Sequence, residues 1–472
     1  MANREDIALM AHLMRRAGFG AAHDELEVLV ENGYEQTVEQ LLHPEQHPDI
    51  DEYELFRYHP MADPPESIAN AQLLWLYRMV NTVRSLQEKV ALLWHHVFAT
   101  GNDKVSSAID ISIQIQMFRD KGMGKFRELL VELAKSPAMI FWLDNQENHK
   151  RAPNENWGRE LMELFSLGVG HYTEKDVFEC ARAFTGWTIK HKIPQLPWGP
   201  HPWSFEYRPE DHDNGEKIFL GHMGNFNGQD IIDIILQQPA CPKFVMRHLY
   251  NFFVADEPEV PKWPSEPPRD SDAINLLSET WVSNDFEMKP VLRVLFNSDF
   301  FKDARYEKVR SPVEVVAGTL RLIGAMKGPH PNWADMPGQT QAMGQDLLNP
   351  PSVEGWHTGR EWINSGALIN RVNFVADRVR NTDLPGVQNI IRRIAAETSA
   401  DENSVTAEVL VERCLYEMGP LDVEEATRSQ LVLHARSHGP VSFETNEKRP
   451  EFSRLVGDLL ALISGTREYQ FG

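Results

Sequence analysis

Apolar residues return every three or four positions along most of the chain, which is the spacing of amphipathic helices. The clearest such stretches are Ile7 to Arg16, Ser67 to Ala99 with one break, and Lys125 to Lys135. Alternation of apolar and polar positions, the period of a strand, is clear from Trp203 to Tyr207. Lys217 to Leu220 could return beside this segment as the second strand of a hairpin.

These patterns predict a mainly α protein. We expect a large multi-helix single domain spanning residues 1–472, with a small β-hairpin and long loops rich in Pro and Trp. Residues 387–472 contain three or four more helical patterns and are expected to form a C-terminal helical part of the same unit. The sequence has no internal repeat at the period of a solenoid.

The stretch from Asn154 to Val177 is the most informative part of the chain. It reads as a helix that ends at Gly168, followed by a second helix that starts at Thr173 with Asp176 in the pattern of a capping box and continues to Trp187. At about 100° per residue, an apolar stripe runs along the first helix beside a polar sector of about 60°. That sector holds Asn156, Glu160 and Glu163.

Two interpretations of these acids are open. In the first, Glu155, Glu160 and Glu163 are structural: they accept hydrogen bonds from backbone amides and pair with arginines, for which the candidates are Arg159, Arg182, Arg15 and Arg16. In the second, they bind a divalent metal, or one of them acts as a general base, because carboxylates one helical turn apart can reach a single ion or substrate. Helical di-metal proteins usually add Glu-x-x-His pairs, which this helix lacks.

Other polar groups extend the second interpretation. His95 is a candidate catalytic partner of Glu160 and Glu163, and His212 could be another acid/base group. Candidate metal ligands are Glu160, Glu163, His212 and Asp213. The residues from Asp213 to Gly215 are also of the types that favour a tight turn, so a purely structural role in a turn is the alternative.

Aromatic residues in irregular segments suggest where a substrate could bind. Trp203 and Trp356 lie in or beside loops rich in Pro and Gly, and exposed Trp is a frequent platform for flat ligands. We take Arg159, Trp203 and Trp356 as substrate-binding candidates. Buried anchors of the loops are the alternative role for these tryptophans.

Composition narrows the classes of function. With 47 Lys and Arg against 69 Asp and Glu, the net charge is −22, which disfavours binding to nucleic acid or to anionic membranes. No stretch has the roughly 20 apolar residues of a membrane span. The three cysteines lie far apart, without the spacing of a zinc or redox motif, so we expect small buried side chains. Gly-x-Ser-x-Gly, Walker and His-Glu-x-x-His motifs are absent.

Several stretches together resemble the DUF1800 family, a large bacterial group of unknown function. The longest is PNENWGRELMELFSLGVGHYTEKDVFECARAFTGW, from Pro153 to Trp187. The others are HLMRRAGFG, LQEKVALLWHHVFAT, DHDNGEKIFLG, RSPVEVVAGTLR, MGQDLLNPPSVEGW and LLALISGTREYQ. His95 matches a His common in that family, whereas this chain has Val97 where relatives often have a second His.

The resemblance implies family membership over nearly the whole chain and carries no activity with it. It leaves open a hydrolase or metal-assisted enzyme, a non-catalytic binding or assembly protein, and an accessory factor to a DUF1501-type partner. The accessory role predicts an exposed apolar patch near Trp198, Trp203 or Trp356. Many relatives carry export signals, whereas the start of this chain has no long apolar segment, which favours a cytoplasmic location.

Overall fold

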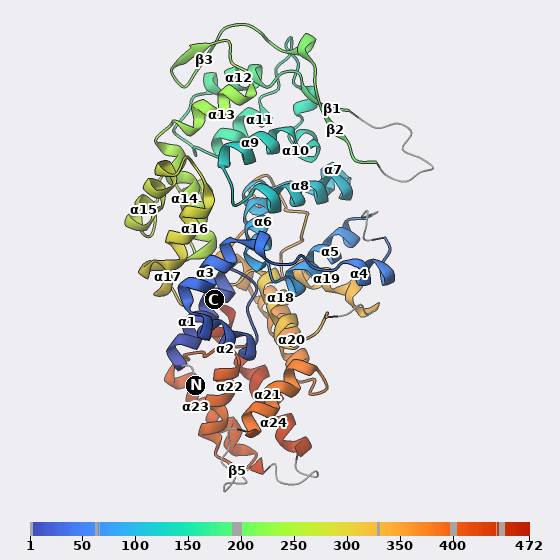
Figure 1. The fold of residues 1–472 in the computed structure, drawn as a ribbon, viewed down its shortest axis with the longest axis vertical. Coiled ribbons are helices and arrows are strands. Elements are labelled where there is room, and N and C mark those ends of the chain that lie inside the picture. The colour runs from blue at the N-terminus through green and yellow to red at the C-terminus, as the bar shows by residue number, and fades with distance from the viewer. Residues whose placement is uncertain are drawn as a thin grey trace.

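Helices build most of the molecule, as the spacing of apolar residues predicts. The computed structural model describes residues 3–61, 65, 67–190, 201–327, 331–396, 404–439, 441–442 and 449–472. Figure 1 shows an elongated arrangement with α9–α13 at one end, α21–α24 at the other, and the N-terminal helices between them. The mainly α class is therefore confirmed.

The first half of the chain supplies the middle and one end of the molecule. Its helices are α1 (Arg4–Arg16), α2 (His23–Asn32), α3 (Tyr34–Leu42), α4 (Tyr53–Tyr58), α5 (Ile68–Asn81), α6 (Ser85–Val97), α7 (Asn102–Val105), α8 (Ala108–Lys121), α9 (Phe126–Lys135), α10 (Pro137–Trp142), α11 (Asn156–Glu163), α12 (Glu174–Ala183) and α13 (Gly228–Leu236). The expected break between residues 67 and 99 separates α5 from α6.

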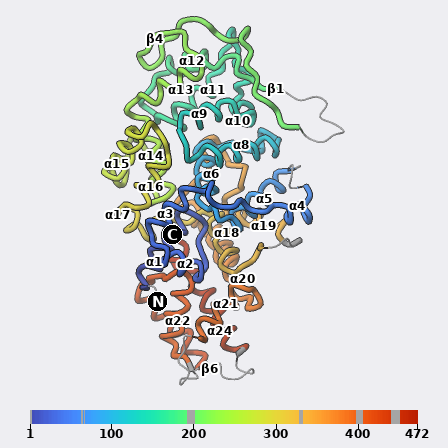
Figure 2. Tube along the Cα trace, viewed as in Figure 1, coloured from blue at the N-terminus to red at the C-terminus, as the bar shows by residue number. Residues whose placement is uncertain are grey.

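The second half continues down one side and forms the other end (Figure 2). Its helices are α14 (Ala240–Phe253), α15 (Ser271–Ser283), α16 (Met288–Asn297), α17 (Asp299–Lys302), α18 (Pro312–Leu322), α19 (Met336–Ala342), α20 (Ser365–Val379), α21 (Pro385–Ala396), α22 (Ala407–Glu417), α23 (Glu425–Ser437), α24 (Arg449–Ser464) and α25 (Arg467–Gln470).

The strands are short and pair in antiparallel couples. They are β1 (Trp187–Lys190), β2 (Ser204–Tyr207), β3 (Lys217–Phe219), β4 (His222–Gly224), β5 (Ser404–Val405) and β6 (Val441–Ser442). β1 pairs with β2 from Trp187 opposite Tyr207 to Lys190 opposite Ser204, β3 pairs with β4, and β5 with β6.

The expected pairing of residues 203–207 with 217–220 is wrong, although both segments are extended. Residues 217–219 pair instead with the next segment, because Leu220 and Gly221 both have positive φ and close a two-residue turn. Residues 204–207 pair with Trp187–Lys190, since the helix expected to reach Trp187 ends at Ala183.

Burial is continuous along the molecule. One cluster of buried apolar side chains extends from Ile7 in α1 to Tyr469 in α25. Cys180, Cys241 and Cys414 are buried free thiols, as expected for small core residues. Among the helices in the described ranges, none is both long and apolar enough to cross a bilayer.

The last residues of the chain return to the middle of the molecule, where Figure 1 places the C-terminus near α1 and α3. The Gly472 amide donates to the Lys308 carbonyl at 2.9 Å, and the Tyr306 amide donates to the Gly472 carbonyl at 2.9 Å. The buried Arg371 of α20 donates from Nε to Gln470 Oε1 at 2.8 Å and from Nη2 to the Arg310 carbonyl at 2.7 Å. These bonds join the C-terminal segment to α20 and to the start of α18.

Candidate functional site

α11 begins where its sequence signals predict, but it ends at Glu163, before the expected stop at Gly168. The Asn154 side chain accepts a hydrogen bond from the Asn156 amide at 3.0 Å, and Trp157 and Leu161 form the buried face. Gly168, with φ of 80°, ends the following turn, and its amide donates to the Met162 carbonyl at 2.9 Å. A Cβ on Gly158 would lie 3.1 Å from the Val177 carbonyl oxygen, so glycine allows α11 to pack closely on α12.

The two carboxylates of α11 have no basic partner. Glu163 accepts a hydrogen bond from Tyr172 Oη at 2.8 Å. Arg159 instead binds Glu174 at 2.7 Å and Glu155 at 3.4 Å. Within the described ranges, no Lys, Arg or His forms an ion pair with Glu160 or Glu163.

The other arginines proposed as structural partners bind elsewhere. Arg182 pairs with Glu179 and Asp213, both at 2.7 Å. Arg15 donates to the Gly419 carbonyl at 3.2 Å, and Arg16 to the Phe253 carbonyl at 3.1 Å. The acids of α11 therefore remain uncompensated by the cations that the structural interpretation requires.

The environment of Glu160 favours its protonated form. Burial, together with the negative charges of Glu163 and Glu354, raises the pKa of this carboxyl to about 7, although Arg159 acts in the opposite direction. Two neighbouring acids in a partly buried site resist simultaneous ionisation, because each charge raises the energy of the other. Both protonation states of Glu160 are therefore populated near neutral pH.

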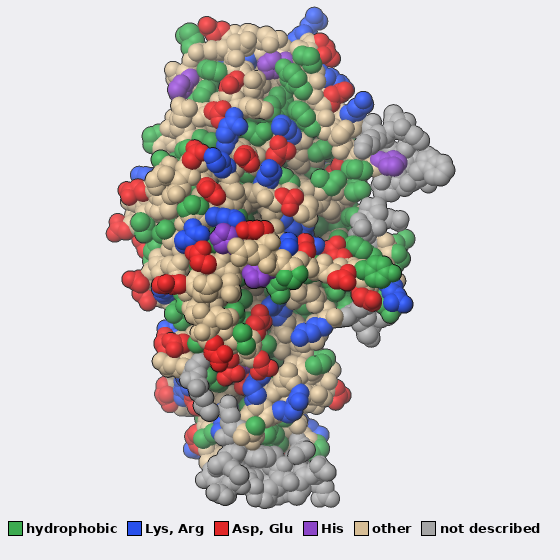
Figure 3. All heavy atoms as spheres, in the orientation of Figure 1, with side chains coloured by type: hydrophobic (Ala, Val, Ile, Leu, Met, Phe, Trp, Pro, Cys, Tyr) green, Lys and Arg blue, Asp and Glu red, His purple; other side chains and the backbone are tan. Residues whose placement is uncertain are grey.

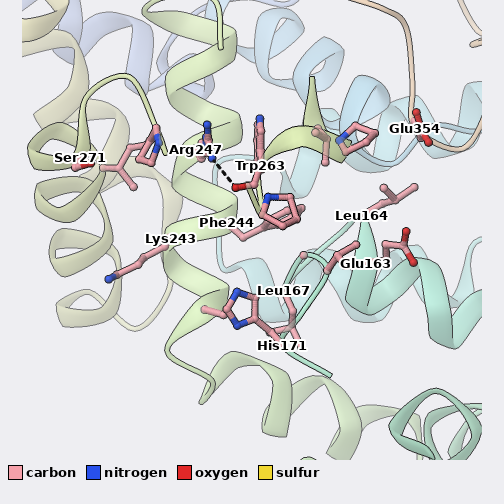
Figure 4. A pocket seen from close by; sticks show the side chains of 18 of the residues that line it. Glu163, Leu164, Leu167, His171, Lys243, Phe244, Arg247, Trp263, Ser271 and Glu354 are labelled. Atoms are coloured by element: carbon pink, nitrogen blue, oxygen red, sulfur yellow. Dashed lines mark hydrogen bonds between the residues drawn. The ribbon is translucent and has the colours of Figure 1, made fainter. Parts of the chain in front are cut away.

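A pocket of about 530 Å³ opens beside the end of α11. It lies between the segment from Glu163 to His171, α14, the 3₁₀ turn η4 (Val260–Lys262) with the loop after it, and the start of α15. Figure 4 shows side chains from these elements converging on one space. This volume lies within the roughly 300–1,000 Å³ of small-molecule sites.

Aromatic and aliphatic side chains form most of the pocket wall. Phe244 and Trp263 meet edge to face with ring centroids 5.3 Å apart, and Leu164 and Leu167 lie across from them. A hydrogen bond fixes the orientation of the Trp263 ring, because its Nε1 donates to the Pro258 carbonyl at 2.7 Å.

Arg247 holds this aromatic wall in place. Its guanidinium lies 4.6 Å from the centre of the Trp263 ring and pairs with the buried Glu257 at 2.7 Å. It also donates to the Glu266 carbonyl at 3.0 Å and the Pro267 carbonyl at 3.2 Å. With its donors bound to the protein, Arg247 supports the loop between α14 and α15.

The two sides of the pocket carry side chains of opposite charge. Glu163 and Glu354 lie on one side in Figure 4, and Lys243 lies on the other. Glu354 is exposed and forms no ion pair with any described residue. His171, from the turn after α11, also lines the pocket.

His95 lies outside this pocket. Its ring is fully buried between Trp75 and Trp356, with centroid distances of 5.6 Å and 5.2 Å. Neither of its nitrogens has a hydrogen-bond partner among the described residues, and burial lowers the pKa of the imidazole to about 3. His95 therefore stays neutral at physiological pH and does not contribute to the lining of the pocket.

His212 and Asp213 bind their own loop and the end of α12. His212 Nδ1 lies 2.9 Å from the Thr185 carbonyl, and the Asp213 amide donates to Thr185 Oγ1 at 2.8 Å. A hydrogen bond from Arg182 lowers the pKa of Asp213. Within the described ranges, no group of three or more His, Cys, Asp or Glu side chains is arranged to hold a metal ion.

The aromatic candidates occupy two different places. Trp203 is half-buried against Phe141, with ring centroids 5.0 Å apart. Trp356 is buried, stacks on His96 and donates from Nε1 to the Asp346 carbonyl at 3.2 Å. Trp198, the third residue of the predicted apolar patch, lies outside the described residues.

The sequence alone identifies Glu160 and Glu163 as candidate site residues, but it identifies none of the residues that form the aromatic wall of the pocket. Phe244, Trp263 and Lys243 come from segments read only as helix or loop. Glu354 and Tyr172 both fall within stretches that carry the family resemblance, MGQDLLNPPSVEGW and the motif around α11. Two of these stretches therefore meet at one pocket, which could not be recognised from the sequence before the fold was known.

Comparison with known proteins gives one match. A family model described as "Protein of unknown function (DUF1800)" matches residues 12–471. No curated protein and no solved structure matches the chain.

Proposed function

The chain belongs to the DUF1800 family, and we propose that it is an enzyme that performs general acid–base chemistry, as a hydrolase, on a small molecule held beside α11. The observation that carries the proposal is the pair of carboxylates, Glu160 and Glu163, neither of which forms an ion pair with a described Lys, Arg or His; Glu163 lines a pocket of about 530 Å³, and Glu160 lies one helical turn before it. Structural ion pairing would have matched these acids with arginines.

The two acids have different roles in the proposed reaction. Glu163 lines the pocket and, oriented by Tyr172, accepts a proton from the attacking water. Glu160 holds a proton near neutral pH and donates it to the leaving group. Water adds to the substrate as the bond to the leaving group breaks, and proton exchange with solvent then restores the pair. Typical contributions of such catalysis are about 10²–10⁴ in rate.

The first test is direct titration of Glu160. We expect the carboxyl band in pH-difference infrared spectra to change with an apparent pKa near 7 and to disappear in Glu160→Gln. Glu155→Gln, on the residue that caps α11, is the matched control and should leave the band in place. Titration of the Glu160 band in the ordinary range of a glutamate would remove the basis of the acid–base assignment.

The second test is turnover. A panel of nitrophenyl esters, phosphates and glycosides should include a substrate that the wild-type protein hydrolyses and that Glu163→Gln hydrolyses at least about 100-fold more slowly. Equal rates for wild type and Glu163→Gln would show that the hydrolysis arises elsewhere.

A further inference from the structure

We propose that the pocket takes a ligand that joins a protonated amine to an apolar, preferably aromatic, body. The amine binds at Glu354, on the side of the pocket where Glu163 also lies, and the body lies along Phe244 and Trp263. This inference rests on the same pocket as the proposed function and names the class of molecule that it accepts.

The charge at one side of the pocket favours a cationic head group. Glu163 and Glu354 both line the pocket, and neither forms an ion pair with a described Lys, Arg or His. Figure 4 shows both on the same side. An ammonium group would supply the missing opposite charge and donate up to three hydrogen bonds.

The cations near the pocket cannot offer an anionic head group an equivalent place. Arg247 lines the wall, but its donors are used by Glu257 and by carbonyls of the loop. Lys243 is exposed to solvent and lies across the pocket from the acids. A single solvated lysine binds an anion weakly, because water screens the attraction.

The walls fit an apolar body of modest size. Phe244 and Trp263 present ring edges and faces, and Leu164, Leu167 and Ile274 complete the lining. A flat body gains contact area and favourable ring geometry against such walls. The ammonium gains further attraction where it approaches an aromatic face.

Three probes with one body test the head group: tryptamine, tryptophol and indole-3-propionate carry an ammonium, a hydroxyl and a carboxylate on the same indole. Isothermal titration at neutral pH should show tryptamine binding about fivefold more tightly than tryptophol, with indole-3-propionate weakest, since fivefold corresponds to the roughly 1 kcal/mol of one well-placed charge pair. Equal affinities, or tighter binding of the carboxylate, would overturn the proposal.

Variants distinguish binding of the amine at the pocket from the attraction that the overall negative charge of the protein exerts on any cation. Acidic side chains are spread over the face drawn in Figure 3, and the net charge of −22 attracts any cation. Glu354→Gln should reduce the preference for tryptamine over tryptophol by about threefold to fivefold. Glu279→Gln removes the same charge from an exposed position of α15 that does not line the pocket, and should leave the preference unchanged. Equal effects of the two substitutions would contradict the assignment.

A blocking variant locates the binding. Asn275 lines the pocket from an exposed position of α15, so Asn275→Trp should fill the space without disturbing the core and should abolish binding of tryptamine. Equal binding of tryptamine and tryptophol to wild type, with both blocked by Asn275→Trp, would contradict the preference for an amine. The acid–base role of Glu160 is tested separately by its infrared titration. Failure of all three probes to bind at millimolar concentration also overturns the amine proposal.

Discussion

Glu160 keeps its carboxyl in surroundings that disfavour its charged form. Burial and the charges of Glu163 and Glu354 raise its pKa to about 7, and no cation contacts it among the described residues. In the unfolded chain this group titrates near 4.5, the value of an isolated glutamate. The folded protein therefore binds an extra proton at this position between those two pH values.

The sign of the stability effect follows from that difference. As pH rises from about 4.5 to about 7, the folded state must hold a proton that the unfolded state has released, so Glu160 makes the free energy of unfolding smaller. Above pH 7 the penalty is constant, and it is absent below pH 4.5.

Glu160→Gln should relieve the penalty. We expect the variant to be more stable than wild type by about 1–2 kcal/mol at pH 8, after allowance for partial solvent exposure, and equally stable at pH 4. Urea unfolding followed by circular dichroism at both pH values measures this. A stability gain that is the same at pH 4 and pH 8 would contradict the electrostatic origin.

At the scale of elements, capping boxes start α12 and α13 in the same way. Thr173 and Asp176 exchange side-chain and backbone hydrogen bonds at the start of α12, and Asn227 and Asp230 do so at α13. Asp176 has one further role, since its Oδ1 accepts a hydrogen bond from the Leu220 amide at 2.8 Å. Asp176 thus attaches the turn between β3 and β4 to the helix that packs on α11.

Asp176→Ala should cost more stability than Asp230→Ala. Each substitution removes a capping interaction worth about 1 kcal/mol, and Asp176→Ala also leaves the Leu220 amide without its acceptor, for a further loss of about 1 kcal/mol. The two free energies of unfolding, measured in urea under identical conditions, give the comparison. Equal losses would mean that the contact with Leu220 contributes nothing.

Local signals account for what the sequence predicts at this scale. The cap at Thr173 and the left-handed Gly168 involve residues within a few positions, and both are present in the structure. The partner of residues 204–207 depends instead on where α12 ends, which the apolar spacing does not specify. The same limit applies to the pocket, because Glu163 is recognisable from its helix whereas Trp263 and Glu354 reach it only through packing.

At the scale of the whole molecule, the C-terminal segment is tied to the middle through Gln470. Its Oε1 accepts from the buried Arg371, its Nε2 donates to the Ser464 carbonyl at 2.7 Å, and its backbone carbonyl accepts from the Arg310 amide at 3.1 Å. These contacts support our proposal that residues 387–472 fold as part of one unit with the rest of the chain.

Gln470→Ala should therefore weaken the entire protein. It leaves the buried Arg371 guanidinium with one fewer acceptor, and we expect a loss of about 2–3 kcal/mol in a single unfolding transition. Gln229→Ala, on an exposed residue of α13, is the control and should change stability by less than about 0.5 kcal/mol. A separate early transition for the C-terminal helices would contradict the single unit.

The wide separation of the pocket residues along the chain affects how the protein is made. Glu163 and Glu354 are 191 positions apart (354 minus 163), and α14 and α15 fall between them. A ribosome that adds roughly 5–20 residues per second needs roughly 10–40 s to synthesise that interval. During that time Phe244 and Leu164 can meet while the acidic side of the pocket is incomplete. The nascent protein therefore has the apolar wall and Glu163 before it has Glu354, so a chaperone that binds apolar surface can cover the wall before the second carboxylate is in place.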